Sequence, residues 1–249
     1  MSGAAGSSQW MYASGYTAEA SLKFNDDDAS YLTRTPATAG NRKTFTFSAW
    51  VKRSNIGIQQ TLMSVNSADN NSGILHIYLA SDDEITISFQ AFTLTTAPLL
   101  RDTAAWYHIM FVADTTQAAE ANRFKIFLNG DQLTLGSSGT FIAQNTDLAF
   151  CQATEHNIGR RDGDADRYFD GYLAEVNFID GTALTPASFI STGAHGKILP
   201  KKYGGAFGTT GFYLPFKMDY EVEGFNAINW DGRSLANFDN FYVGMVQVL

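Results

Sequence analysis

The chain has 249 residues, of which 45% are hydrophobic, 14% aromatic and 17% charged, so it can build the packed core of one large domain. The formal net charge is −8 and the 17 basic residues are scattered, which predicts no binding to the phosphate backbone of nucleic acids. No run reaches the roughly 18 apolar residues of a membrane span and the N-terminal residues do not resemble a secretion signal, so we expect no membrane insertion.

Residues 1–20 form the first distinct segment. They are rich in glycine, alanine and serine, with Trp10, Tyr12 and Tyr16 interspersed, and they show no period of a helix or a strand. Such a segment cannot offset its own conformational entropy when it is isolated. The composition therefore predicts either an arm that orders against a neighbouring molecule or a disordered terminus.

From residue 21 onward, strand-like segments recur about every ten residues. They are rich in β-branched and aromatic residues, and several alternate between apolar and polar positions. The predicted strands are 21–24, 30–34, 44–53, 60–65, 74–80, 84–92, 106–114, 123–130, 148–153, 171–179 and 211–216. Asn129-Gly130 predicts a tight hairpin turn, because both central residues of a type I′ turn need a positive φ.

Helical signals are weak throughout the chain. Residues 114–123 contain good helix formers but no apolar face, so we interpret them as a long hairpin loop. Many short strands with regular turns predict an all-β fold, a two-sheet antiparallel jelly-roll sandwich. Beyond residue 190 the chain is glycine-rich and loop-like until the strand at 211–216, which we expect to close the sandwich.

Several side chains are predicted to be core rather than functional. Strand phase places Trp50, Trp106, Phe127 and Phe169 in the interior. Cys151 is interpreted as a small core residue, since a free cysteine is usually buried and a catalytic thiol needs a neighbouring base. His76 and His108 fall within predicted strands and are expected to pack rather than to bind a ligand.

A family resemblance is carried by four segments: FTFSAWVKR, WYHIMFVAD, RFKIFLNGDQL and NIGRRDGDADRYFDGYLAEVNFIDGTALTPASF. In this order they resemble the laminin-G-like, concanavalin A-like jelly-roll superfamily. The segments SLKFNDDDASYLTRTPATAGNRKTFTFSAWVKR and GFYLPF are similar to a branch found in virion proteins of tailed bacteriophages, especially marine ones. The resemblance implies a jelly roll over residues 21–190, between an N-terminal arm (1–20) and a C-terminal extension (191–249).

The superfamily includes glycoside hydrolases, so the carboxylates of segment 171–180 need a test. In one such group a strand reads E-[IV]-D-x-x-E, whereas this chain reads Glu175-Val176-Asn177-Phe178-Ile179-Asp180. In that group the charge of the middle carboxylate helps to separate the pKa values of the acid and the nucleophile. Here an asparagine stands in its place, so this charge is missing. We therefore expect no enzyme activity and a structural role for Glu175; a glycan depolymerase using Glu175 and Asp180 is the less favoured alternative.

Metal binding is a second hypothesis for this region. Asp162, Asp164 and Asp166 form a D-x-D-x-D series of hard oxygen ligands that suit Ca²⁺. The series is not an EF-hand, because Arg167 and Leu173 stand where a glycine and a glutamate belong. The favoured interpretation is a solvated acidic turn neutralised by neighbouring arginines, with calcium as the alternative. Residues 25–28 form a second acidic turn of the same kind.

Sugar binding would use an aromatic side chain on a loop, flanked by polar groups. Tyr168 and Arg167 are the candidate glycan-binding residues, with the polar loop 66–72 as a further contributor. The whole pattern predicts a non-enzymatic phage virion protein, either a capsid decoration protein or a head or tail fibre. Its expected partners are capsid or tail proteins and further copies of itself, and its expected location is the particle surface. The alternative function is recognition of host-surface glycans.

Overall fold

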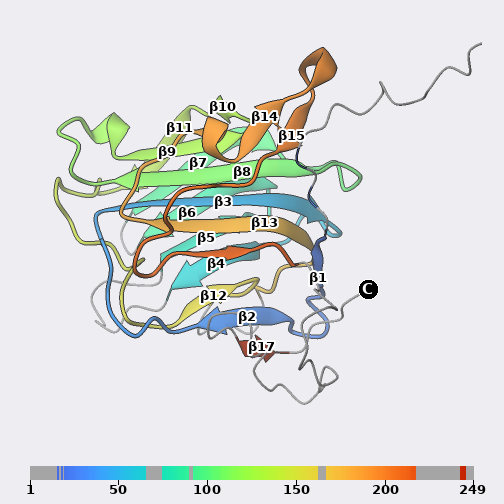
Figure 1. Ribbon diagram of the computed structural model, residues 1–249, viewed down its shortest axis with the longest axis horizontal. Helices are drawn as coiled ribbons and strands as arrows, with labels where there is room; N and C mark the ends of the chain where they lie inside the picture. The colour runs from blue at the N-terminus through green and yellow to red at the C-terminus, as the bar shows by residue number, and fades with distance from the viewer. Residues whose placement is uncertain are drawn as a thin grey trace, which may run out of the picture.

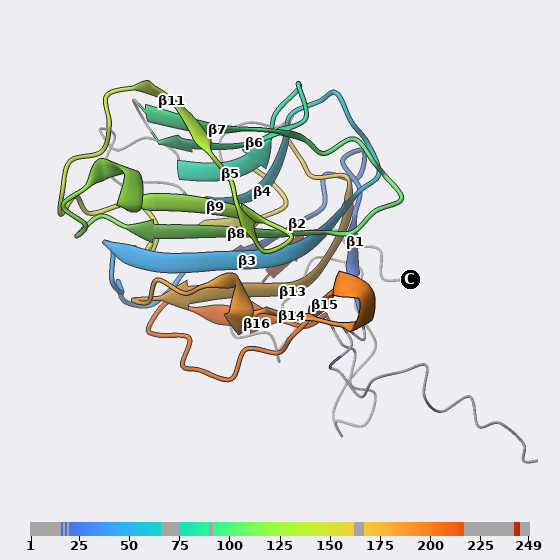
Figure 2. The ribbon, with the colours of Figure 1, turned by 90° about the horizontal axis from the view of Figure 1, so that it is seen from above.

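The structure, a computed structural model, describes residues 16, 18, 20–65, 75–89, 92–161, 167–216 and 242–244. Two antiparallel sheets pack face to face, which confirms the all-β jelly-roll sandwich (Figures 1 and 2). Short 3-10 turns are the only helices among these residues: η2 (Glu120–Asn122), η3 (Pro186–Ser188) and η4 (Ala194–Gly196). No helix in the described ranges is long and apolar enough to cross a membrane.

The first sheet has seven strands, with β1 and β16 side by side along the same edge of β13. Its order continues from β13 through β3, β8 and β9 to β10. The bounds are β1 Leu22–Phe24, β13 Gly171–Asp180, β3 Thr44–Arg53, β8 Tyr107–Asp114, β9 Phe124–Leu128, β10 Asp131–Gln132 and β16 Phe212–Leu214. The expected closing strand at 211–216 is thereby confirmed as β16.

The second sheet has eight strands in the order β11-β7-β6-β5-β4-β12-β2-β17. Its bounds are β11 Leu135–Gly139, β7 Phe92–Leu99, β6 Glu84–Phe89, β5 Leu75–Leu79, β4 Gln60–Val65, β12 His156–Ile158, β2 Tyr31–Arg34 and β17 Tyr242–Gly244. A separate pair, β14 (Ile190–Thr192) and β15 (Ile198–Pro200), follows in the C-terminal extension. Since β17 pairs with β2, a strand from near the C-terminus lies at the edge of the second sheet.

Alternation along the strands explains the core. In β3, Phe45, Phe47, Ala49 and Val51 point between the sheets and are fully buried, whereas the intervening residues face outward. Phe45 lies at the centre of an aromatic group with Phe111, Phe150 and Phe178, at ring-centroid distances of 4.9 to 5.7 Å. The period-2 pattern in the sequence is therefore the cause of the sandwich.

A second, smaller core covers the outer face of the seven-stranded sheet. Met110, Val112, Phe127 and Ile179 point outward from their strands and pack with Phe189. Leu184, and Tyr203 and Phe207 from the C-terminal extension, also pack there. Figure 2 shows β14 and β15 below the sheet, whereas β16 is one of its strands. The extension is thus packed on the sandwich and closes this face.

The hairpin predicted at Asn129-Gly130 is confirmed. Asn129 and Gly130 have φ values of 52° and 95°, and Leu128 pairs with Asp131 across the turn. Residues 114–123 also form the expected connection within a hairpin, between β8 and β9. Both features follow from local chemistry, which explains why the sequence predicted them.

Three local predictions are wrong. Segment 148–153 is a buried turn rather than a strand, because Cys151 takes a φ of 65° and its carbonyl accepts a bond from the Gly40 N–H. Trp106 lies just before β8 and is 37% exposed, so it is not a core residue. Trp50 is on the outward phase of β3 and only half-buried. Phe127, Phe169, Cys151, His76 and His108 are buried as expected.

Candidate binding rim

The loops that join the strands at one end of the sandwich carry the candidate functional groups. This rim includes the segments 54–59, 80–83, 100–106, 159–161 and 167–170. Backbone bonds connect them: Ser54 N–H donates to the Asp170 carbonyl and Thr61 N–H donates to the Arg167 carbonyl. Of the residues predicted to form a site, Asp162, Asp164 and Asp166 lie outside the described residues, as does loop 66–72. Arg167 and Tyr168 are described, and both are partly exposed.

Tyr168 belongs to a group that we call the tyrosine–arginine cluster, which consists of Tyr31, Arg160 and Tyr168. The Arg160 guanidinium carbon lies 3.8 Å from the centre of the Tyr31 ring, a close cation–π contact. The Tyr31 and Tyr168 rings are 6.3 Å apart and tilted by 43°. Arg160 Nη2 also binds Glu155 Oε1 at 2.9 Å, and its Nε donates to Asn157 Oδ1. The cluster is therefore held in place before any ligand arrives.

Behind the cluster, four polar side chains form a row across neighbouring strands, which we call the polar row. Thr33, Asn157, Ser64 and His76 occupy successive register positions on β2, β12, β4 and β5. They face outward, because adjacent residues such as Met63 point into the core. Adjacent strands are about 4.8 Å apart, so the row presents hydrogen-bonding groups at regular intervals.

The polar row has hydrogen-bonding capacity that the described part of the chain does not use. Thr33 Oγ1, Asn157 Nδ2 and His76 Nδ1 are buried and have no partner among the described residues. Buried polar atoms are normally paired with protein groups or water, because an unmet bond costs about 1–3 kcal/mol. The row therefore has unmet hydrogen-bonding capacity just beneath the surface, which ordered water can satisfy.

His76 lies close enough to Arg161 and Arg167 to be affected by their positive charges. Burial, and after it the charges of Arg161 and Arg167, lower the pKa of His76 to about 3. The ring stacks on Tyr78 at 4.2 Å. His76 is therefore neutral near pH 7, and it can donate or accept a hydrogen bond. Sequence reasoning did not predict this role, nor those of Tyr31 and Arg160, because their strands are far apart along the chain.

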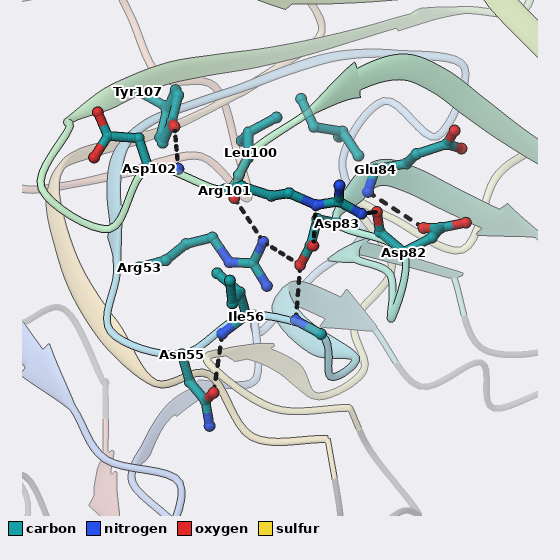
Figure 3. A network of polar contacts seen from close by, with 12 residues as sticks. Arg53, Asn55, Ile56, Asp82, Asp83, Glu84, Leu100, Arg101, Asp102 and Tyr107 are labelled. Carbon is teal, nitrogen blue, oxygen red and sulfur yellow. Dashed lines mark hydrogen bonds and ion pairs between the residues drawn. The ribbon is translucent and has the colours of Figure 1, made fainter.

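A buried charge network supports the rim from inside the sandwich (Figure 3). Asp83 Oδ1 accepts bonds from Arg53 Nη1 at 2.9 Å and from the Gly57 N–H at 2.8 Å. Asp83 Oδ2 binds Arg101 Nε at 2.8 Å, and Arg53 Nη1 also donates to the Leu100 carbonyl. Burial raises the pKa of the Asp83 carboxyl, but these bonds outweigh it and hold the pKa below its ordinary value. Three rim loops are tied together at this one carboxylate.

The carboxylates considered for catalysis are engaged elsewhere. Glu175 lies at a bulge of β13 with a φ of 50°, and its two oxygens accept bonds from the Tyr16 and Tyr213 hydroxyls, each at 2.8 Å. Burial, followed by the bonds to Tyr16 and Glu175, raises the pKa of Tyr213. Asp180 accepts the N–H groups of Asn41 and Thr210 at 2.7 and 2.9 Å. Both carboxylates thus fasten distant chain segments to β13.

Calcium binding at the acidic turn remains a prediction. Among the described residues, no group of three histidine, cysteine, aspartate or glutamate side chains is arranged to hold a metal. If the Asp162, Asp164, Asp166 series binds calcium, excess calcium will raise the melting temperature through ligand linkage. Thermal unfolding with calcium and with chelator measures this. Equal melting temperatures would remove the hypothesis, and magnesium serves as the control for general charge screening.

Comparison with known proteins places this geometry in context. A family model described as the concanavalin A-like lectin/glucanases superfamily, of laminin G type, matches residues 24–188. No curated protein matches the chain. Among solved structures, the chain is similar to a heptameric SAP-like pentraxin from Limulus polyphemus, with 14% identity, a TM-score of 0.45, and coverage of 66% of this chain and 77% of that one.

Two other solved structures show the same level of similarity. Domains LG4-5 of the mouse laminin alpha1 chain match with 12% identity and a TM-score of 0.48, over 70% of this chain and 47% of that one. The CBM40 module of a Ruminococcus gnavus IT-sialidase matches with 14% identity and a TM-score of 0.42, over 62% and 94%. At these identities the similarity concerns the fold alone.

Proposed function

The chain belongs to the concanavalin A-like lectin/glucanases superfamily, and from that premise we propose that it is a non-catalytic carbohydrate-binding protein. The observation that supports this proposal most is the tyrosine–arginine cluster in front of the polar row. Fixed aromatic rings offer apolar faces to a sugar ring, and neighbouring polar groups bind its hydroxyls. Loop-borne contacts on a rigid sandwich are a common arrangement for recognition.

The hydrogen bonds of Glu175 and Asp180 support the non-catalytic part of the proposal. Hydrolysis with retention needs two carboxyl groups that face one substrate and differ in pKa. Here one carboxylate accepts two tyrosine hydroxyls and the other accepts two backbone N–H groups. We therefore assign both to the folding of the chain, and detectable polysaccharide turnover that Glu175→Gln abolishes would contradict this assignment.

A glycan array with the purified protein tests the binding function. Tyr168→Ala is expected to weaken binding of any glycan that the array identifies by about tenfold or more, because an anchoring aromatic is worth at least 1–2 kcal/mol. Tyr172→Ala is the matched control, since Tyr172 is also half-buried but lies on the other sheet, on β13. The proposal would be contradicted if both variants lost glycan binding equally, or if the unmodified protein bound no glycan on the array.

We propose as a second function that the protein is a structural component of a phage virion, attached to neighbouring subunits or further copies through its terminal segments. The segments that carry the phage resemblance become β1, β2, β3 and β16, and β1 and β16 pair with the same edge of β13. Tyr16 lies against Glu175, so a tether that leaves the sandwich would precede this residue.

Deleting residues 1–15 tests the attachment. The truncated protein keeps Tyr16 and its bonds to the sandwich, so it is expected to fold. It is expected to bind phage particles that lack this protein much more weakly than the full chain does. Co-sedimentation with particles measures binding, and thermal unfolding checks the fold. Full binding by the truncated protein would exclude the N-terminal segment as the tether.

A further inference from the structure

Arg53 occupies an unusual position at the end of β3. It continues the inward series of Ala49 and Val51, so its side chain points between the two sheets at the rim. The side chain is 0% exposed. Its Nη1 atom is fully used, since it donates to Asp83 Oδ1 and to the Leu100 carbonyl. Arg53 therefore bridges the seven-stranded sheet and the loops of the eight-stranded sheet.

The other two nitrogens of Arg53 are unused. Nε and Nη2 are buried and have no hydrogen-bond partner among the described residues. In a guanidinium these two N–H groups lie along one edge and point in parallel, which is the geometry that binds both oxygens of a carboxylate. Two buried donors without acceptors are costly. The two N–H groups of this edge therefore need a hydrogen-bond acceptor that the described residues do not provide.

The paired N–H groups of this edge match the two oxygens of a carboxylate. Arg53 and Arg101 share one carboxylate, that of Asp83, whose oxygens already accept three bonds. The neighbouring acids do not supply another. Asp82 Oδ1 accepts the Glu84 N–H and Asp102 Oδ1 accepts the Ala104 N–H, and both aspartates are exposed. Among the described residues, no acidic side chain contacts the free edge of Arg53.

The loop 54–58 gives a route to this edge. In Figure 3, Asn55 and Ile56 lie on the side of the Arg53 guanidinium opposite Leu100. Ile56 and Ile58 are 40% and 38% exposed, so the loop gains little from burial of its own apolar side chains. The Gly57 N–H ties it to Asp83 Oδ1, the oxygen that Arg53 also binds. A ligand reaches this edge only if the loop lifts, which breaks the bond between the Gly57 N–H and Asp83.

We propose that Arg53 anchors the carboxylate of an acidic saccharide, in the manner of a uronic acid, at the rim beneath loop 54–58. This inference rests on the proposed carbohydrate-binding function and narrows it to sugars with a carboxyl group. The Arg53 edge and the tyrosine–arginine cluster belong to the same rim, because loop 54–61 is bonded to the segment 167–170. The carboxylate supplies the two acceptors that Arg53 Nε and Nη2 lack among the described residues.

The decisive measurement uses the unmodified full-length protein. Arginine Nε–H groups give separate signals in ¹⁵N–¹H NMR spectra, and titration with glucuronate is expected to shift the Arg53 signal and to saturate. Glucose, which has the same ring without the carboxylate, is expected to leave that signal unchanged. No shift with glucuronate would mean that ordered water fills the edge, and it would overturn the proposal. An equal shift with acetate at the same concentration would show a site for any carboxylate and would also overturn the saccharide assignment.

Substitutions provide a second, independent test. Arg53→Lys keeps the charge but removes the paired donors, and it is expected to weaken glucuronate binding at least tenfold. The control is Arg123→Lys, because Arg123 is also buried, at 6% exposure, but donates to backbone carbonyls away from this rim. Equal weakening by both variants would contradict the role of Arg53. If Arg53→Lys does not fold, the NMR titration alone decides.

The glycan array separates this inference from the function on which it rests. Preferential binding of acidic glycans over matched neutral ones supports both. Equal binding of acidic and neutral glycans, with an unresponsive Arg53 signal, would overturn the Arg53 inference while the carbohydrate-binding function stands. Absence of binding to every glycan and to glucuronate would overturn both.

Discussion

Replacing Asp83 with alanine is expected to lower the free energy of unfolding by about 3–5 kcal/mol, because it leaves a buried guanidinium without its carboxylate. Asp83 is only 3% exposed, and the Arg53 side chain beside it is fully buried. The same substitution removes the acceptor for the Gly57 N–H and for Arg101 Nε. Urea unfolding measures the change, and the rim loops are expected to become more sensitive to protease.

Two variants isolate the cause of this loss. Asp82→Ala changes the exposed neighbour and is expected to alter stability by less than about 0.5 kcal/mol. Asp83→Gly also removes the carboxylate but suits the positive φ of 73° at this position, so it is expected to be somewhat less damaging than alanine. A stable Asp83→Ala variant would show that the network contributes little to folding.

Replacing Gly171 with alanine is expected to cost about 3–4 kcal/mol, from a strained backbone and a steric clash together. Gly171 begins β13 with a φ of 151°, a conformation that side chains rarely adopt. An added Cβ would collide with the Lys52 carbonyl oxygen and would lie 2.8 Å from Phe169 Cζ and 3.1 Å from Arg53 Cα. Since backbone atoms of β3 cannot move without breaking the sheet, the clash cannot be relieved locally.

The matched control for Gly171 is Gly204, which has no positive φ and open space around its Cα. Gly204→Ala is expected to change stability by less than about 0.5 kcal/mol. Thermal and urea unfolding of both variants measure the difference. Similar stability of the two alanine variants would contradict the close approach of β13 to β3 at the rim.

Both substitutions act on the rim that carries the proposed function. Gly171 pairs with Arg53, and Arg53 binds Asp83, so sheet pairing and the charge network meet at one residue. The tyrosine–arginine cluster reaches the same rim through the segment 167–170. Loss of stability at Asp83 or Gly171 is therefore expected to weaken ligand binding as well, so the glycan-array test uses Tyr168 and Tyr172 instead.

Much of the fold could be predicted because its causes are local. Alternation in residues 44–51 places phenylalanines on one face of a strand whatever the rest of the chain does. Asn129-Gly130 makes a tight turn because these two residues tolerate positive φ values. Segment 148–153 is a buried turn and not the predicted strand. A short run of apolar residues shows no periodicity that would distinguish a buried turn from a buried strand.

The amino-acid sequence by itself determined the all-β class, the inward and outward faces of β3 and the Asn129-Gly130 turn, since each depends on residues that are neighbours along the chain. It also indicated Arg167 and Tyr168 as loop residues of interest. Only the tertiary structure decided that Arg160 packs on Tyr31, that Asn157 and His76 share one row, and that two buried donors of Arg53 have no acceptor in the described part of the chain. Strand register and desolvation set these features, and both arise only when segments distant in sequence come together in space.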